Sequence, residues 1–385
     1  MRIHFTKLEL QNWKNFRAVD IGLQQRMFFV GPNASGKSNL LDALRFLRDL
    51  ATPKGGLASA LDARGGMPHL RSLHFVSSKS DVGVHANLLI DDVAWEYELA
   101  LRGTIKKPFA IAREVVRRAG TVVLQRPDAD DRRDPRRLEQ THLEQISQNR
   151  SFRALVDALA STQFVHVVPQ LARAPELRSS EEALRDSPGS NFIEELAGLP
   201  EKAQKRKLRM LEKLLAVAVP QFDELRITRE PKTGQPHLEA KYSHWRARGS
   251  WQNEREFSDG TLRLIGLLWA ILEGSTPLVL EEPELSLHED VVARLPGLLH
   301  SAAARRGRQI FVSTHANSML SDGVDPSELV LLEPTQHGTK VTLGSENKHI
   351  VNEVKAALPL GDSVRANTRP ARIEQLALPL TLGAR

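Results

Sequence analysis

The chain has 385 residues, of which 41% are hydrophobic and 26% charged. A chain of this length and hydrophobic content can bury a sizeable core in one large domain or two closely joined domains. Its 53 basic and 47 acidic residues leave a formal charge of +6, a mild excess that permits an anionic partner such as nucleic acid. The absence of cysteine excludes disulfide frameworks and thiolate metal sites. The longest apolar run, 264–272, is too short to cross a bilayer, and the first ten residues lack the apolar core of a signal peptide. We therefore expect a cytoplasmic protein without membrane contact.

The first third of the chain predicts strands on both sides of a glycine-rich loop. Two alternating stretches read as strands, at 3–13 and 18–23, and the stretch 26–30, with its apolar run 27–30, reads as a buried strand. The loop follows, and leucines at helical spacing then predict a helix from Asn39 to about Leu50. Alternating runs between 83 and 127 predict antiparallel strands joined by tight turns.

The middle of the chain predicts helices and one strand pair. The expected elements are an exposed loop at 128–137, a helix at 138–160, a strand at 164–169, a loop at 179–191, helices between 191 and 219, and a hairpin formed by 224–231 and 237–245. The last third predicts a helix after Ser258, strands at 277–282, 310–312, 328–334 and 339–344, a helix at 348–358 and a tail. We divide the chain into an N-terminal ATPase lobe (1–127), a helical insert lobe (128–250), a C-terminal ATPase lobe (251–345) and a C-terminal helix with tail (346–385).

Two basic stretches bear on nucleic-acid binding. Lys202, Arg206, Arg209 and Lys213 share one face of a predicted helix, while leucines line another face. A second basic stretch runs from Lys106 to Arg118. A solvated charged face and a phosphate-contacting surface both explain such patterns, and neither stretch contains the interleaved aromatic residues that base stacking requires.

The glycine-rich loop fits the pattern Gly-x4-Gly-Lys-Ser between a strand and a helix, which is the setting of a phosphate-binding loop. Its backbone N–H groups would face phosphates, Lys37 would reach the β and γ oxygens, and the Ser38 hydroxyl would bind Mg²⁺. The expected nucleotide-binding residues of the loop are Gly31, Pro32, Asn33, Ala34, Ser35, Gly36, Lys37, Ser38 and Asn39.

Three further motifs carry the expected chemistry. Glu281 and Glu282 end an apolar strand, and we assign the first to the Mg²⁺ shell and the second to the attacking water. His315 ends the next apolar strand, from which it could touch the γ-phosphate. Ser258 and Gly260 begin the apolar helix before the carboxylates, which makes that helix start an anion site.

The order of loop, serine–glycine turn, carboxylate strand and strand-end histidine resembles the ATP-binding-cassette class of ATPases. Within it, "LELQNWKNFRAVDIGL", "FSDGTLRLIGLLWAIL", "EEPELSLHED" and "STHANSML" are similar to the RecF, SMC and OLD group. The resemblance implies an α/β P-loop NTPase head with an antiparallel β subdomain and a helical lobe. It departs from the group where Glu281 replaces the commoner aspartate and Ala316 replaces a serine.

The resemblance also implies an assembly. Two heads would sandwich two ATP molecules in a homodimer or higher oligomer, with Ser258 and Gly260 of one head completing the site of the other. We identify Gln170 as the candidate for the group's Mg²⁺-sensing glutamine. The chain lacks heptads for long SMC arms, and no Asp-x-Asp of a Toprim nuclease follows His315.

These features predict an ATP hydrolase that uses ATP and Mg²⁺, with Lys37, Glu282 and His315 as catalytic residues. We expect it to regulate a DNA-directed process, in antiphage defence or DNA repair, through a separately encoded effector such as a nuclease. A scaffold that hydrolyses ATP slowly and sequesters an effector is an alternative. A DNA-repair loader that acts like RecF and binds duplex DNA is another.

Overall fold

The computed structural model of the chain describes residues 1–53, 55–72, 74, 80–103, 109–173, 191–243, 250–320 and 323–369. The predicted loop over 179–190, the basic pair Lys106 and Lys107, and the predicted tail from 370 onward lie outside the described residues. Among the helices that the structure describes, none is long and apolar enough to cross a membrane.

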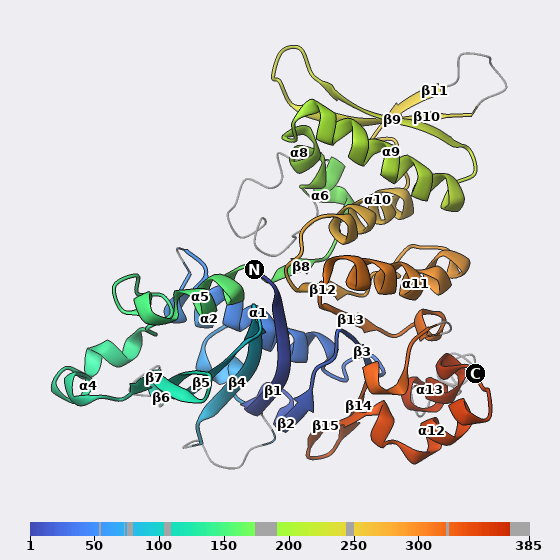
Figure 1. Cartoon of the computed structure of the whole chain (residues 1–385). Coiled ribbons are helices and arrows are strands. Elements are labelled where there is room, and N and C mark those ends of the chain that lie inside the picture. The colour runs from blue at the N-terminus through green and yellow to red at the C-terminus, as the bar shows by residue number, and fades with distance from the viewer. Residues whose placement is uncertain are drawn as a thin grey trace, which may run out of the picture.

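A six-stranded, mostly parallel sheet forms the centre of the molecule (Figure 1). Its strands lie in the order β15 (Gly338–Leu343), β14 (Leu329–Thr335), β3 (Arg26–Val30), β13 (Ile310–Thr314), β12 (Leu278–Glu281) and β8 (Gln163–Val165). Neighbouring strands are parallel except β15, which pairs antiparallel with β14. The carboxyl ends of the parallel strands therefore meet at one edge, where the glycine-rich loop, the carboxylates and the histidine follow them.

Two layers cover the two faces of this sheet. Alternate side chains of β3 divide between them, so that Met27 and Phe29 join one apolar cluster and Phe28 and Val30 join the other. The first layer contains α1 (Lys37–Ala51), α2 (Leu57–Asp62), α3 (Met67–Leu70) and α5 (Arg153–Ala160). The second layer contains α10 (Asp259–Leu272), α11 (Glu289–Arg306), α12 (Lys348–Lys355) and α13 (Leu360–Thr368). Burial on both faces explains why the central strands are apolar almost throughout.

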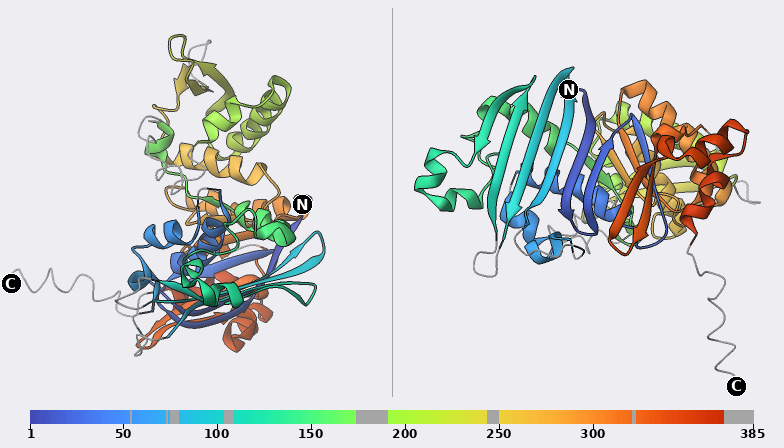
Figure 2. Two further views of the ribbon diagram at one scale, coloured as in Figure 1. Left: turned by 90° about the vertical axis from the view of Figure 1, so that its left-hand side faces the viewer. Right: turned by 90° about the horizontal axis from the view of Figure 1, so that it is seen from below.

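A second six-stranded sheet, antiparallel throughout, packs into the first layer. Its order is β2 (Phe16–Gly22), β1 (Ile3–Trp13), β4 (Val82–Ile90), β5 (Val93–Arg102), β6 (Ala110–Arg118) and β7 (Thr121–Arg126). Figure 2 shows these strands side by side on one flank of the molecule. Asp91 and Asp92, with positive φ angles, form the turn between β4 and β5, as two-residue hairpins of matching twist require.

A smaller lobe, built around a third sheet, stands above the central sheet in Figure 1. It combines α6 (Pro169–Arg173), α8 (Phe192–Ala197) and α9 (Glu201–Ala218) with the sheet β11 (Ser250–Asn253), β10 (Pro236–Tyr242) and β9 (Phe222–Arg229). Helix α10 contributes to the apolar core of this lobe and also to the second layer of the central sheet. This double burial accounts for the continuous apolar run 264–272.

The expected strands on both sides of the glycine loop, the following helix and the helices between 191 and 219 are confirmed. Three expectations in the middle of the chain are wrong in part. The helix expected at 138–160 exists only as α5, and the strand expected over 164–169 ends at Val165. The loop expected at 128–137 contains the short helix α4 (Ala129–Arg133) and most of the 3-10 helix η1 (Pro135–Glu139). The other 3-10 helices in the described ranges are η2 (Asn149–Phe152), η4 (Asn317–Leu320), η5 (Pro326–Glu328) and η6 (Gly344–Glu346). The division into four parts stays a prediction.

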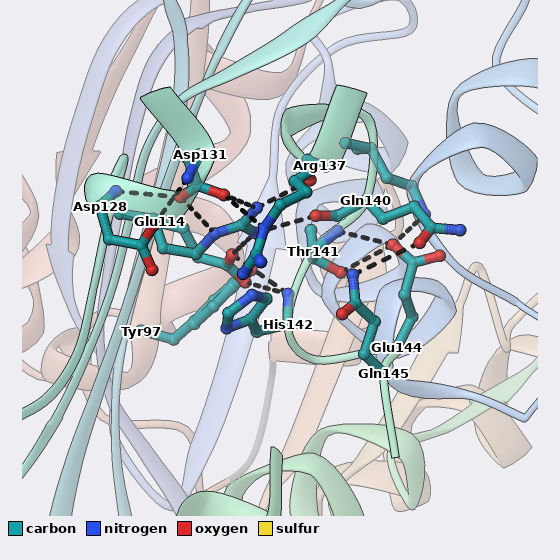
Figure 3. Close-up of polar contacts among 12 residues, drawn as sticks. Tyr97, Glu114, Asp128, Asp131, Arg137, Gln140, Thr141, His142, Glu144 and Gln145 are labelled. Atoms are coloured by element: carbon teal, nitrogen blue, oxygen red, sulfur yellow. Dashed lines mark hydrogen bonds and ion pairs between the residues drawn. The ribbon is translucent and has the colours of Figure 1, made fainter. Parts of the chain in front are cut away.

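A buried charged cluster on the antiparallel sheet explains the irregular segment before α5 (Figure 3). The guanidinium of Arg126 lies 2.8 Å from Glu114 and 2.9 Å from Asp131, and all three side chains are fully buried. Glu114 also accepts the backbone N–H of His142, at 3.0 Å. A backbone group that serves this carboxylate cannot serve a helix, so the local helical spacing is overruled.

Candidate functional site

The glycine-rich loop joins β3 to α1 and requires glycine at two positions. Gly36 has a φ of 98° and precedes the first turn of α1, and a side chain there would overlap Asn15. A Cβ at Gly31 would lie 2.5 Å from the carbonyl oxygen of Leu332. No side chain caps α1, so the N–H groups of its first turn are directed at the loop without a side-chain partner. This arrangement suits an anionic ligand.

Lys37 is held inside the loop. Its Nζ donates hydrogen bonds to the carbonyl oxygens of Gly31, at 2.9 Å, and Pro32, at 3.2 Å. Burial lowers the pKa of Lys37, whereas the nearby carboxylates of Glu282 and Glu284 raise it. The two carbonyl contacts are neutral, so an arriving polyphosphate would offer the ammonium group better partners.

The loop is braced from the antiparallel sheet. Asn15, in the turn between β1 and β2, donates from Nδ2 to the Ser35 carbonyl oxygen (3.1 Å) and to Thr339 Oγ1 (2.7 Å). Its Oδ1 accepts from Asn39 Nδ2 at 2.8 Å, and Thr339 Oγ1 donates to the Ser35 carbonyl oxygen at 2.8 Å. The sequence contained an Asn-Phe turn but no sign that Thr339 would meet it, because the two lie 324 positions apart.

The two predicted carboxylates leave the end of β12 in different surroundings. Glu281 accepts a hydrogen bond from Arg45 Nη2 of α1 at 2.6 Å. Glu282 has a φ of 44°, a left-handed conformation that costs a non-glycine residue free energy, and its N–H donates to the Ser313 carbonyl oxygen at 2.9 Å. Arg263 of α10 lines a small cavity together with both carboxylates.

His315 lies beside two carboxylates at the end of β13. Its Nδ1 is 3.5 Å from Oε1 of Glu282 and 3.5 Å from Oε1 of Glu284. Glu284 is 5% exposed and accepts hydrogen bonds from Thr314 Oγ1 (2.6 Å) and the His315 N–H (3.1 Å), while its Oε2 is buried without a partner among the residues that the structure describes. Sequence reasoning missed Glu284, and the only available signal was the third acidic residue of the "EEPE" run.

The serine–glycine turn starts α10 as predicted. Ser258 is exposed, and its Oγ accepts the N–H of Thr261 at 3.1 Å as a helix cap. A Cβ at Gly260 would lie 2.5 Å from the carbonyl oxygen of Ser286, which follows the carboxylates along the chain. The glycine therefore allows the helix start to touch the segment after β12.

Gln170 lies exposed in α6, directly after β8 at the edge of the central sheet. Arg173 of the same helix donates to the carbonyl oxygen of Phe257 and pairs with Asp259, both at 2.6 Å. Helix α6 thus links the sheet edge to the serine–glycine turn. The Mg²⁺-sensing role of Gln170 stays a prediction.

The residues present suit a nucleotide with a metal ion that is held partly by phosphate. Among the described residues there is no group of three or more histidine, aspartate and glutamate side chains arranged to hold a metal. Mg²⁺ commonly takes one or two protein ligands and completes its shell with phosphate and water. The hydroxyl of Ser38 and the carboxylate of Glu281 are the oxygen ligands that the motifs offer.

Comparison with known proteins defines the class. A family model described as "AAA domain, putative AbiEii toxin, Type IV TA system" matches residues 26–321, from β3 to beyond the strand-end histidine. Because this match spans more than half of the chain, the chain belongs to this AAA-domain family. No curated protein matches the chain.

Solved structures agree on the fold. An SMC head bound to the C-terminal winged-helix domain of ScpA aligns with a TM-score of 0.53 at 18% identity, over 88% of this chain and 97% of that one. The Pyrococcus furiosus SMC head with an extended coiled coil, bound to the C-terminal domain of ScpA, also gives 0.53, at 16% identity, over 92% and 100%. The predicted ABC-type head fold with an antiparallel β subdomain is therefore confirmed.

Proposed function

We propose that the chain is a Mg²⁺-dependent ATP hydrolase of the RecF, SMC and OLD type, whose complete site forms when two heads meet around ATP. One observation carries the proposal. Lys37, Glu282 and His315 come from three separate elements and converge at the carboxyl edge of the central sheet, where His315 Nδ1 is 3.5 Å from Glu282. Family membership supports nucleotide use, and the geometry supports hydrolysis.

Each residue has a defined task in this proposal. Lys37 leaves its two backbone carbonyl partners for the β and γ oxygens of ATP. Glu282 accepts a proton from the water that attacks the γ-phosphorus, so that ADP and phosphate leave. His315 donates a hydrogen bond to the γ-phosphate and registers its loss. Mg²⁺, held by Ser38 and Glu281, would neutralise charge on the β and γ oxygens.

The second head supplies the rest. Ser258 and Gly260 are the proposed partner contribution, because Ser258 is exposed at a helix start and its backbone neighbours offer N–H groups. Because Gly260 packs against the segment that follows β12, a movement of the carboxylates during hydrolysis would shift this segment and, with it, the helix start that faces the second head. Dimerisation driven by ATP and reversed by hydrolysis follows.

We further propose that this cycle regulates a separate effector, such as a nuclease, in a DNA-directed process of the cytoplasm, either antiphage defence or repair. The family description, which refers to a toxin–antitoxin system, supports a defence role. The SMC heads with the same fold were solved with ScpA domains, which supports a protein partner for this head as well.

The Glu282→Gln variant tests hydrolysis. We expect turnover to fall by roughly 10²- to 10⁴-fold, since the amide cannot accept the proton from water. The variant should accumulate as an ATP-bound dimer, measured by light scattering with and without ATP and Mg²⁺. Lys37→Ala is the matched control, which should lose both turnover and the dimer. A wild-type protein without turnover would instead support the scaffold described next.

A slowly hydrolysing scaffold is the second candidate, and one contact favours it. Arg45 occupies the Glu281 carboxylate at 2.6 Å, where Mg²⁺ would have to bind. If this ion pair persisted with ATP present, the head would bind nucleotide and turn it over poorly. In that case the Glu282→Gln variant and the wild type would form equally long-lived dimers.

Mixing inactive variants tests the shared site. Ser258→Arg and Lys37→Ala proteins are each expected to be inactive, whereas each mixed dimer in a one-to-one mixture contains one intact site, so that the mixture should recover turnover up to about a quarter of the wild-type value. The control replaces Lys37→Ala with the double variant Lys37→Ala/Ser258→Arg, which leaves no intact site. Absence of recovery, with both proteins folded, would remove the shared-site proposal.

A further inference from the structure

We propose that the outward face of α9 binds the phosphate backbone of duplex DNA, an inference that rests on the DNA-directed role proposed above and gives it a surface. The face is a row of exposed cations at helical spacing: Lys202, Lys205, Arg206, Arg209 and Lys213. At 1.5 Å per residue, the row extends about 16 Å along the helix. Its long side chains enclose a shallow groove along α9 together with Met210.

The inward face of α9 has a different composition and a clear structural task. Leu208, Leu211 and Leu215 are buried in the core of the small lobe. Lys207, the cation on this side, donates to the carbonyl oxygen of Leu272 at 3.1 Å and pairs with Glu273 at the end of α10. These contacts fix how the helix is rotated. They therefore leave the five outward cations exposed to solvent.

The outward row of cations lowers the stability of the helix, and no contact within the protein compensates for this loss among the described residues. Lys202 and Arg206, and Arg209 and Lys213, are like charges four residues apart, which repel one another on a helix surface. Lys202 also lies in the first turn, beside the positive end of the helix dipole. Within the described ranges these four cations form no ion pair, and only Lys205 is paired, with Glu201. An anionic partner would turn this unfavourable row into a favourable one.

The chemistry of the row selects a duplex among polyanions. Single-stranded nucleic acid is held by aromatic side chains on which bases stack, and the outward positions between 202 and 213 contain none. A row of cations on one straight helix suits the regular spacing of phosphates along a rigid duplex. Lysine and arginine contacts to phosphate position a protein without reading bases, so we expect binding that is independent of sequence.

Fluorescence anisotropy of a labelled 30-base-pair duplex tests the surface. The test variant changes Lys202, Arg206, Arg209 and Lys213 to Gln, and a matched variant removes four exposed cations elsewhere, Arg132, Arg136, Lys232 and Lys348. Each lost phosphate contact lowers the slope of log affinity against log salt by about 0.9. We expect the α9 variant to lose about 3 to 4 units of slope and more than about a hundredfold in affinity at 0.1 M salt. The matched variant should keep nearly all of the wild-type slope.

The outcomes separate this surface from the rest of the proposal. Three results would each overturn the proposed DNA-binding surface. They are equal salt slopes for wild type and the α9 variant, a loss of slope in the matched variant as large as in the α9 variant, and tighter binding of a single strand than of a duplex of the same length. Unfolding temperature checks the fold, and we expect it to stay or rise because repulsion is removed. ATP turnover is measured on the same proteins without DNA. Turnover without duplex binding contradicts only the α9 surface, whereas absent turnover contradicts the proposed hydrolase.

Discussion

Glu284 holds the end of β13 in place through two hydrogen bonds from that strand. Its Oε1 accepts the Thr314 hydroxyl at 2.6 Å and the His315 N–H at 3.1 Å. The carboxylate is buried, so these bonds form in surroundings where water does not compete. His315 Nδ1 is equally far, at 3.5 Å, from Glu284 and from Glu282. Glu284 therefore positions the histidine against the residue that we assign to the attacking water.

This geometry predicts different effects for two substitutions at Glu284. Glu284→Gln keeps an oxygen acceptor for Thr314 and His315, so ATP turnover should fall only a few-fold. Glu284→Ala leaves both donors unpaired and frees the end of β13, and we expect turnover to fall by about 10²-fold, as misplacement of a catalytic group does. Steady-state phosphate release gives kcat and KM, and the loss should be in kcat.

The partial rescue by glutamine distinguishes positioning from other roles. Equal loss in both variants would mean that the charge matters rather than the acceptor. Wild-type turnover in Glu284→Ala would show that His315 needs no support. Nucleotide binding, measured separately with a fluorescent ATP analogue, should be unchanged in both variants.

At the scale of elements, local chemistry made the core of the site predictable. A strand, a glycine loop and a helix follow one another within about 25 residues, and both carboxylates and His315 follow apolar strands. Each part of the site could therefore be predicted from residues that are close together in the sequence. Their convergence followed from the shared carboxyl edge of a parallel sheet. The whole β3–loop–α1 unit was therefore accessible from residue patterns.

Elements that depend on distant partners were not predictable. The segment 138–148 has helical spacing, but the backbone N–H of His142 bonds to Glu114, and nothing in the residues of this segment shows that the carboxylate lies on β6. Arg45 likewise reads as one charged residue in a helix until β12 brings Glu281 within 2.6 Å. In the first case a long-range polar contact competed with local spacing, and in the second the helix formed as expected but its polar partner lies 236 positions away.

At the scale of the whole molecule, the segment that follows the buried charged cluster connects the antiparallel sheet to α2 in the first helical layer. Beyond Arg126 and its two carboxylates, Glu144 accepts the N–H of Thr141 at 2.7 Å and the N–H of Leu57 at 3.3 Å, at the start of α2 (Figure 3). Breaking such a cluster on one side leaves an uncompensated buried charge, which typically costs about 3–5 kcal/mol. Because the antiparallel sheet and the first helical layer share one apolar cluster, we expect them to unfold together.

His142 makes the stability of this unit depend on pH. Burial, together with the neighbouring Arg126, lowers its pKa from 6.5 to about 4, although Asp131 and Asp128 act in the opposite direction. Between pH 6.5 and 4 the unfolded chain binds a proton at this residue that the folded protein does not, so stability falls as the pH falls. Over pH 7 to 5 this one histidine should remove on the order of 2 kcal/mol.

Urea unfolding of wild type and His142→Leu at pH 7 and pH 5, followed by circular dichroism, isolates this contribution. Leucine keeps the backbone N–H that serves Glu114 and removes the only group that titrates at this position. The difference in unfolding free energy between the two pH values should therefore shrink by on the order of 2 kcal/mol in the variant. An unchanged pH difference in His142→Leu would mean that His142 titrates alike in folded and unfolded protein. Asp131, whose pKa Arg126 holds at about 2 against the cost of burial, could not account for that difference, because its contribution to stability is lost only below about pH 4.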